Sequence, residues 1–227
     1  MPTIALTSSK GGCGKSTTAL ILASAFSSDG YSVRIVDADR SQRIVRWAEQ
    51  GALPKEITVV GADEKTLRTV VDEARAVSDV VIIDVEGSAN MSVALAIGYS
   101  DVVIVPANPS APDVEDAVST IALIRDTEAM VRRAIPHALL WTRVPSAIRS
   151  REVAALEAQV ERGGIPILGR VFERTAYKSL WSYATTLDLL PQAEVPGIAK
   201  SQAEAAELAK LTVELIQANA KAQGEAA

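Results

Sequence analysis

The chain of 227 residues is long enough to bury the core of one α/β domain, and its formal net charge of −5 reflects 23 Lys and Arg against 28 Asp and Glu. One Cys and one His exclude an intramolecular disulfide and argue against a zinc site or a His-based catalytic triad. The start of the chain lacks a basic segment followed by an apolar one, so no secretory signal is expected and the predicted location is the cytoplasm.

The first segment with a recognisable chemistry joins a predicted strand at residues 3–7 to a predicted helix at residues 18–26. Between them runs Ser-Ser-Lys-Gly-Gly-Cys-Gly-Lys-Ser-Thr, residues 8–17. A Gly-rich turn in this position lets backbone N–H groups converge on phosphate oxygens, and the helix N-terminus adds its positive dipole end. Lys15 is predicted to bridge the β- and γ-phosphates of a nucleotide, and the Ser16 hydroxyl to ligate Mg²⁺.

Two positions distinguish this loop from the standard phosphate loop. Ser9 stands where the pattern G-x-x-x-x-G-K-[ST] has its first glycine, and Lys10 follows at once. The pattern x-K-G-G-x-G-K-[ST] resembles the deviant Walker A loop of the ParA/MinD family of P-loop ATPases. The resemblance implies ATP and Mg²⁺ as cofactors, and a Lys10 that reaches across a homodimer to the partner's nucleotide; the alternative is an ordinary solvated lysine. The residues expected to contact ATP in this loop are Lys10, Gly11, Gly12, Cys13, Gly14, Lys15, Ser16 and Thr17.

A second predicted strand, at residues 32–37, leads into the run Asp-Ala-Asp-Arg-Ser-Gln. Two carboxylates at the carboxyl end of a strand lie beside the phosphate loop in a doubly wound sheet. The run resembles the family's D-x-D-P-Q switch segment, with Asp37 and Asp39 in register, Arg40 and Ser41 in place of the Pro and Gln, and Gln42 one residue later. By that resemblance Asp39 orients or polarises the attacking water and Asp37 supports the magnesium shell. The alternative is a polar strand end that caps the next helix.

The next carboxylate ends a fully apolar run. A helix at residues 43–50, a strand at 57–60 and a helix at 64–76 are predicted before Val-Val-Ile-Ile-Asp at 80–84. This run has the Walker B pattern, in which a buried parallel strand delivers Asp84 to the magnesium-bound water. The residues expected at the metal are therefore Ser16, Asp37 and Asp84.

The residues after Asp84 depart from the family pattern. Gly87 is placed to supply a turn that senses the γ-phosphate. Glu86 is unexpected beside a triphosphate, because like charges repel, and its role is left open between a second water-orienting carboxylate and an outward-pointing side chain. The residues expected to be catalytic are therefore Lys10, Lys15 and Asp39.

Strands and helices continue to alternate along the rest of the chain. Strands are predicted at residues 101–106, 138–142 and 165–171, and helices at 114–129, 149–162, 176–183 and 201–220. The pair Thr142 and Arg143 resembles the pair that lines the adenine pocket in relatives. We therefore predict that residues 1–227 form a single α/β domain with a doubly wound, mostly parallel sheet flanked by helices, as in P-loop NTPases.

The charge is unevenly distributed. Residues 125–178 carry 10 Lys and Arg against 6 Asp and Glu, a net charge of +4 in an acidic chain. A local basic region of this kind is compatible with a DNA-binding face. The alternative is a set of scattered arginines paired with Glu152, Glu157 and Glu173. The residues predicted to contact DNA are Arg149, Arg151, Arg170, Arg174 and Lys178.

The resemblance implies an ATPase that dimerises on binding Mg-ATP and binds DNA non-specifically. Such proteins drive plasmid or chromosome partition with a centromere-binding, ParB-like partner, which stimulates a weak ATP hydrolysis, and they associate with the nucleoid in the cytoplasm. An accessory ATPase of conjugative DNA transfer shares the same motifs and is the alternative. A MinD-like membrane ATPase is less well supported, because the last predicted helix carries Glu204, Glu207 and Glu214 against Lys210 and is not basic. No membrane partner is therefore expected.

Overall fold

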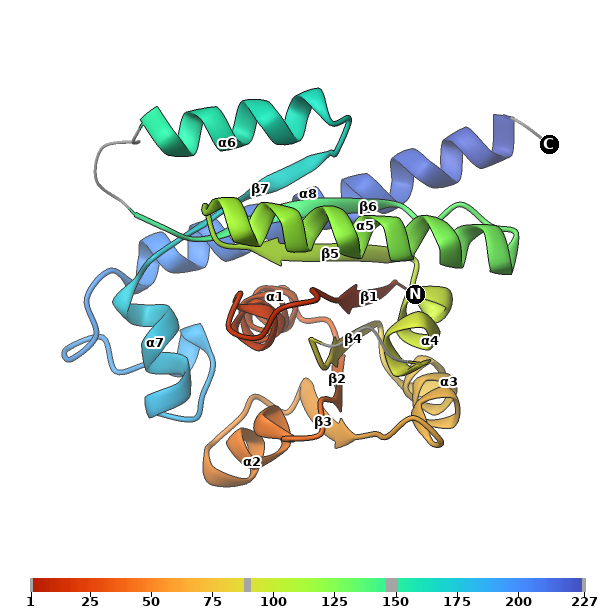
Figure 1. Ribbon diagram of the computed structural model, residues 1–227. Helices are drawn as coiled ribbons and strands as arrows, with labels where there is room; N and C mark the ends of the chain where they lie inside the picture. Colours follow the sequence, from red (N-terminus) through yellow and green to blue (C-terminus); the bar gives the residue numbers. More distant parts are fainter. Residues whose placement is uncertain (1, 88–90, 146–150, 226–227) are drawn as a thin grey trace.

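The computed structural model describes residues 2–87, 91–145 and 151–225, and its centre is a seven-stranded sheet with helices on both faces (Figure 1). The strand order is β3-β2-β4-β1-β5-β6-β7, and every neighbouring pair is parallel. The strands are β1 (Thr3–Leu6), β2 (Val33–Ala38), β3 (Ile57–Gly61), β4 (Val80–Val85), β5 (Val102–Ala107), β6 (His137–Val144) and β7 (Ile167–Phe172).

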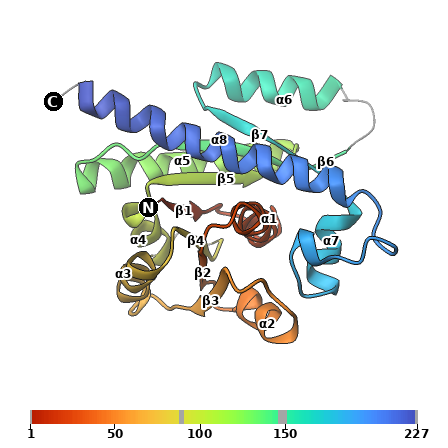
Figure 2. The same ribbon diagram turned by 180° about the vertical axis from the view of Figure 1, so that it is seen from behind.

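The helices form two layers, one on each face of the sheet (Figures 1 and 2). The helices of the first layer share one core cluster and are α1 (Lys15–Ser28), α2 (Arg43–Gln50), α7 (Thr175–Ser182) and α8 (Ile198–Glu225), with the short 3-10 helix η1 (Leu187–Leu189). The helices of the second layer share the other cluster and are α3 (Leu67–Val77), α4 (Met91–Tyr99), α5 (Ala111–Val131) and α6 (Arg151–Arg162). The predicted doubly wound α/β fold is confirmed.

Alternation along each strand assigns its side chains to the two layers. In β1, Ile4 and Leu6 join the core under α1, whereas Ala5 joins the core on the opposite face. All four residues of β1 and all six of β4 are buried, as expected for central parallel strands covered on both faces. The continuous apolar runs in the sequence are therefore explained by burial on both faces rather than by an alternating polar side.

The carboxyl ends of three central strands meet at one edge of the sheet. Leu6 of β1 is in register with Asp84 of β4, and Asp84 is in register with Asp37 of β2. In the sheet, β4, β2 and β3 lie on one side of β1, whereas β5, β6 and β7 lie on its other side. This reversal of the strand order opens a crevice at the carboxyl ends, where doubly wound sheets bind ligands.

The largest differences from the predicted helices are at α4 and α8. Helix α4 was not predicted, because its nine residues, Met-Ser-Val-Ala-Leu-Ala-Ile-Gly-Tyr, have no polar face to give a helical period. Helix α8 has 28 residues, beginning before and ending after the predicted range of 201–220. In the described part of the chain, no helix combines the length and the apolar character needed to span a bilayer.

Candidate functional site

The loop between β1 and α1 leaves the N-terminus of α1 open. Gly14 caps this helix with a left-handed φ of 98°, and its side-chain-free position leaves the first turn without a side-chain cap. The Thr142 hydroxyl at the end of β6 donates to the Cys13 carbonyl oxygen at 2.7 Å and so braces the loop. The N–H groups of the first turn are thus available to an anion.

Lys15 is held over this loop rather than extended into solvent. Its side chain is buried, and its Nζ donates to the Lys10 carbonyl oxygen at 3.2 Å. Across the loop, Gly87 approaches the Lys10 backbone so closely that an added Cβ would lie 2.9 Å from the carbonyl carbon. The loop therefore fixes the ammonium group where phosphate oxygens meet the helix N-terminus, and only glycine fits at the neighbouring position after β4.

The Ser16 hydroxyl and the Asp84 carboxylate form the candidate magnesium site. Ser16 Oγ donates to Asp84 Oδ2 at 2.6 Å, while Asp84 Oδ1 is buried without a hydrogen-bond partner among the described residues. Burial, opposed by the Ser16 hydrogen bond and reinforced by the negative charge of Asp37, raises the pKa of Asp84 to about 7. A buried oxygen without a partner, beside a hydroxyl, is what a hydrated Mg²⁺ would satisfy, so these two residues fit the predicted metal.

Asp37, expected to support the magnesium shell, accepts hydrogen bonds from backbone N–H groups, and its place at the metal stays a prediction. The Asp37 Oδ2 accepts from the N–H groups of Ile44 at 2.8 Å and Val45 at 3.2 Å, and its Oδ1 accepts from the N–H of Asp39 at 3.2 Å. The side chain is fully buried. Asp37 thus caps the first turn of α2, which is the structural alternative to a place in the magnesium shell.

Asp39, two residues later, faces the cavity. Its Oδ1 accepts from the Ser41 N–H at 2.7 Å and from the Ser41 hydroxyl at 2.6 Å. Partial burial opposes ionisation, but these two hydrogen bonds and the charges of Arg43 and Lys15 outweigh it and lower the pKa of Asp39. Asp39 is therefore an ionised acceptor at the edge of the site, as a water-orienting carboxylate has to be.

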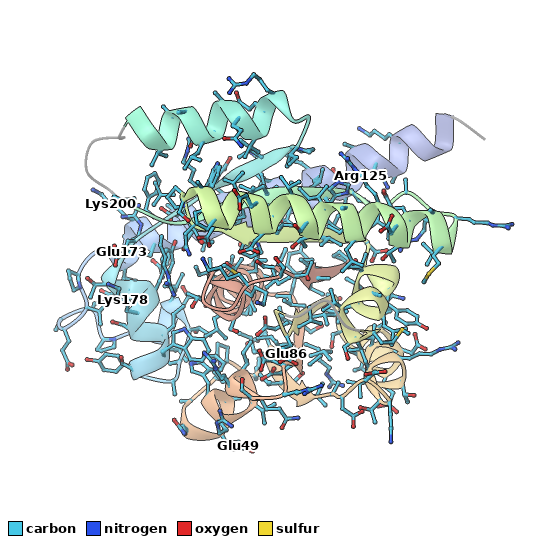
Figure 3. The ribbon with its side chains drawn as sticks, in the orientation of Figure 1. Glu49, Glu86, Arg125, Glu173, Lys178 and Lys200 are labelled. Carbon is cyan, nitrogen blue, oxygen red and sulfur yellow. The ribbon has the colours of Figure 1, made fainter. Side chains whose placement is uncertain are left out.

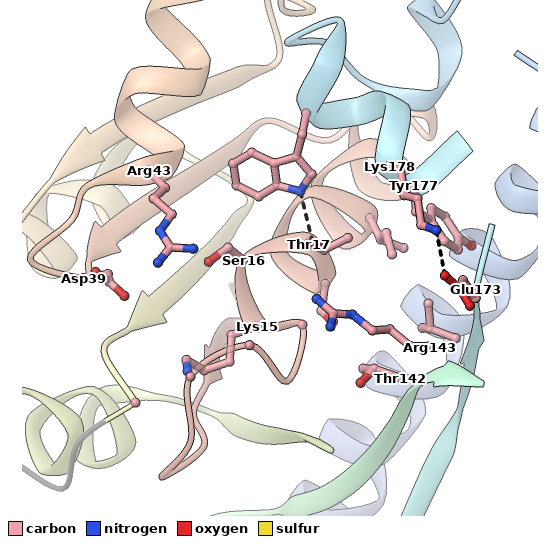
Figure 4. A pocket seen from close by; sticks show the side chains of 18 of the residues that line it. Lys15, Ser16, Thr17, Asp39, Arg43, Thr142, Arg143, Glu173, Tyr177 and Lys178 are labelled. Carbon is pink, nitrogen blue, oxygen red and sulfur yellow. Dashed lines mark hydrogen bonds and ion pairs between the residues drawn. The ribbon is translucent and has the colours of Figure 1, made fainter. Parts of the chain in front are cut away.

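Lys15, Ser16 and Asp39 line a cavity of about 890 Å³, large enough for a nucleotide, and the buried Asp84 reaches it through Ser16 (Figure 4). One wall consists of the loop and the start of α1; the other consists of α7 and the ends of β6 and β7. Arg143 and Thr142 both line the cavity, so the predicted pair lies at the site. The Trp181 indole of α7 donates to the Thr17 hydroxyl at 3.0 Å and joins the two walls.

Lys10 forms a contact within its own chain. Its Nζ lies 3.2 Å from Asp113 Oδ2 in the first turn of α5; 44% of the Lys10 side chain is exposed, against 5% for Asp113. Asp113 also accepts from the Ser110 hydroxyl and from the Asn108 side chain. The side chain is therefore neither free in solvent nor committed to its own phosphate site, and the expected contact with a partner's nucleotide stays a prediction.

Comparison with known proteins identifies the family. The sequence profile of the VirC1 protein family matches residues 1–184. The chain belongs to the VirC1 family. The ParA protein of Rhizobium radiobacter is 34% identical over 189 residues, which are 82% of this chain and 85% of that protein. The predicted membership of the ParA/MinD-type P-loop ATPases is confirmed.

Two solved structures show how widely this VirC1-family fold is shared. McdA of Cyanothece, in complex with ATP, has a TM-score of 0.69 at 18% identity, covering 92% of this chain and 96% of that one. The cell division ATPase MinD of Pyrococcus furiosus has a TM-score of 0.70 at 18% identity, covering 94% and 99%. At these identities the likeness concerns the fold.

Two of the arginines predicted to contact DNA have carboxylate partners in this VirC1-family chain. Arg170 Nε lies 2.8 Å from Oε1 of Glu157, whose side chain is only 3% exposed. Arg174 forms hydrogen bonds of 3.0 and 2.8 Å to Oε2 of Glu204. The pairing of Arg170 with Glu157 agrees with the alternative of arginines paired with nearby glutamates. The pairing of Arg174 with Glu204 joins the end of β7 to α8. Both arginines thus form ion pairs within the fold, and their contact with DNA stays a prediction.

The other three predicted DNA contacts are placed differently. The Lys178 ammonium lies 2.6 Å from Glu173, and both side chains are more than half exposed. Arg151 is the first residue of α6, and Arg149 lies outside the described residues. The DNA-binding assignment stays a prediction for this group.

Two groups at the cavity were not predicted from the sequence. Arg43, the first residue of α2, lines it, and an arginine four residues after Asp39 at a helix start was the available signal. Arg40 pairs with Glu86 at 3.3 Å across the cavity mouth, so the unexpected carboxylate is neutralised from the switch segment. The sequence offered no pattern that would have linked these two distant residues.

Proposed function

We propose that this VirC1-family chain binds Mg-ATP in the cavity and hydrolyses it. The observation that carries the proposal is the convergence of the Lys15 ammonium, the Ser16–Asp84 pair and the Asp39 carboxylate on one cavity at the carboxyl ends of β1, β2 and β4. Such a set matches the requirements of phosphoryl transfer, in which positioning and charge stabilisation supply nearly all of the catalysis.

Each residue has a distinct task in the proposed reaction. The loop N–H groups and Lys15 bind the β- and γ-phosphates, and Ser16 with Asp84 holds the metal. Bound Mg²⁺ supplies charge neutralisation to those phosphates. Asp39, kept ionised by Ser41, accepts a hydrogen bond from the attacking water and orients it. Among the described residues that line the cavity, the other carboxylate near Asp39 is Glu86, and it is paired with Arg40. Asp39 therefore has no free general base to assist it, and we expect slow turnover that a partner stimulates.

We further propose that ATP drives homodimerisation and that the dimer binds DNA without sequence preference. The 34% identity to a ParA protein over most of both chains supports plasmid or chromosome partition, with a centromere-binding, ParB-like partner on the nucleoid in the cytoplasm. ATP tightens DNA binding because a dimer doubles the contacts. A partner that is a relaxase instead of a centromere-binding protein would move the assignment to conjugative DNA transfer.

Phosphate release from Mg-ATP tests the enzymatic part. Wild type should release phosphate slowly, and Lys15→Ala should neither bind Mg-ATP nor hydrolyse it, because Lys15 is the main protein charge on the β- and γ-phosphates. Lys55→Ala, which removes an exposed lysine outside the cavity, is the matched control. Equal hydrolysis by wild type and Lys15→Ala would refute the proposed site.

A further inference from the structure

Arg43 places a cation in the cavity that the proposed mechanism has not used. It is the first residue of α2, and its side chain lines the same cavity as Lys15, Ser16 and Asp39. Figure 4 shows the guanidinium group directed into the cavity, on the side of Asp39 and Ser16. Burial raises the pKa of Asp39, and the positive charge of Arg43 is one of the interactions that lower it.

The guanidinium group has no partner of opposite charge at ion-pair distance in the described part of the chain. By contrast, Arg40 at the cavity mouth pairs with Glu86 at 3.3 Å, and Arg174 on the far wall pairs with Glu204 at 2.8 Å. A guanidinium is always charged and presents paired N–H donors that match phosphate oxygens. Arg43 is thus a cation in the cavity whose charge is left over for a ligand.

The backbone around Arg43 is fixed. Asp37 accepts hydrogen bonds from the N–H groups of Ile44 and Val45, the two residues that follow Arg43. The Trp47 indole one turn later donates to the Leu180 carbonyl oxygen of α7 at 2.7 Å. Helix α2 is therefore anchored to the sheet at its first turn and to the far wall of the cavity through Trp47, which fixes the backbone of Arg43 beside the site.

We propose that Arg43 binds the terminal phosphate of ATP as a second cation supplied by the same chain. The inference rests on the proposed Mg-ATP function and specifies which part of the nucleotide the switch segment reads. The two groups beside the guanidinium are Asp39, assigned to the attacking water, and Ser16, which with Asp84 would hold the metal. The anion between those two groups is the γ-phosphate, and ADP lacks it.

Equilibrium titration with Mg-ATP and Mg-ADP tests the proposal. Arg43→Gln should weaken Mg-ATP binding roughly 10- to 100-fold, the loss typical of a hydrogen bond to a charged group, and leave Mg-ADP affinity unchanged. Arg43→Lys keeps the charge without the planar pair of donors and should fall between wild type and Arg43→Gln. The matched control is Arg46→Gln, because Arg46 is exposed on the same helix and lies outside the cavity.

The outcomes separate this proposal from the function on which it rests. Mg-ATP affinity of Arg43→Gln equal to that of wild type would overturn it, and so would equal losses for Mg-ATP and Mg-ADP, which would assign Arg43 to another phosphate. Failure of wild type itself to bind Mg-ATP would overturn the proposed function. Thermal unfolding of each variant is measured alongside; if Arg43→Gln unfolds early, the same comparison between nucleotides is decided on Arg43→Lys.

Discussion

Asp37 and Asp39 are two residues apart, and their different surroundings give the two carboxylates different roles at this site. Asp37 is fully buried and caps α2, whereas Asp39 is partly exposed, ionised and turned to the cavity. We expect Asp39→Ala to bind Mg-ATP as wild type does but to lose roughly 100-fold or more of its turnover, because orienting the water acts on the transition state. Single-turnover phosphate release with a parallel binding titration measures both quantities, and unchanged turnover would remove Asp39 from the catalytic group.

Asp84 makes the metal-free protein sensitive to pH. Its pKa is about 7 in the folded chain and near 3.8 when unfolded, so between those values the folded chain holds more protons. The free energy of unfolding contributed by Asp84 therefore falls as the pH rises from about 4 to about 7. Asp84→Asn keeps an acceptor for Ser16 and removes this dependence.

Denaturant unfolding in a chelator at several pH values measures the effect. The stability of Asp84→Asn relative to wild type should increase with pH across this window and level off above about pH 7, by an amount on the order of a few kcal/mol. Asp37, whose pKa burial also raises, is present in both proteins, and the difference between the two curves reports the Asp84 charge together with its repulsion of Asp37. Parallel curves for the two proteins would contradict the assignment.

At the scale of elements, one carboxylate of α8 fastens the far wall of the cavity. Oε1 of Glu204 accepts from the Phe172 N–H at 3.0 Å and the Tyr177 hydroxyl at 2.9 Å, and its Oε2 accepts from Arg174. Glu204→Ala leaves the partly exposed Arg174 guanidinium and the buried Tyr177 hydroxyl without this partner and should destabilise the fold by about 2 kcal/mol.

Glu207→Ala is the matched control for that prediction, because Glu207 lies on the same helix, is 59% exposed and forms an exposed ion pair with Lys210 at 4.0 Å. It should change the free energy of unfolding by less than about 0.5 kcal/mol. Chemical denaturation compares the two variants, and similar effects of both would show that Glu204 does not hold β7 and α7 to α8.

The elements that could be predicted from the sequence are those marked by patterns of neighbouring residues. The phosphate loop, the strand ends at Asp37 and Asp84 and the alternation of strands and helices are all encoded within a few neighbouring residues. Helix α4 was missed because burial on most sides leaves no polar period. The pairing of Arg174 with Glu204 joins residues 30 positions apart, so only the folded chain reveals that this arginine has a structural partner.

At the scale of the whole molecule, a net charge of −5 requires that any DNA face be local. Arg151→Glu probes the basic region, whereas changes at Arg170 or Arg174 would also remove their ion pairs to Glu157 and Glu204. We expect Arg151→Glu to weaken ATP-dependent binding to random duplex DNA and to flatten its salt dependence. Binding with fewer phosphate contacts releases fewer counterions from the DNA.

The matched control for DNA binding is Arg68→Glu. Arg68 is 73% exposed on α3, outside the basic region of residues 125–178. Titrations at two salt concentrations, with and without ATP, should leave this variant close to wild type. Equal losses for both variants would show a non-local effect of charge, and no ATP-dependent DNA binding by wild type would count against partition.

Dimerisation by ATP through Lys10 is the central claim of this account, and molar mass in solution tests it most directly. Light scattering on Asp39→Ala, which should hold ATP without turning it over, should report a dimer in Mg-ATP and a monomer in ADP. Adding Lys10→Ala should leave ATP bound and the protein monomeric, because the lysine that leaves Asp113 for the partner's nucleotide is gone. A monomer in Mg-ATP for Asp39→Ala, or an unchanged dimer after Lys10→Ala, would contradict it.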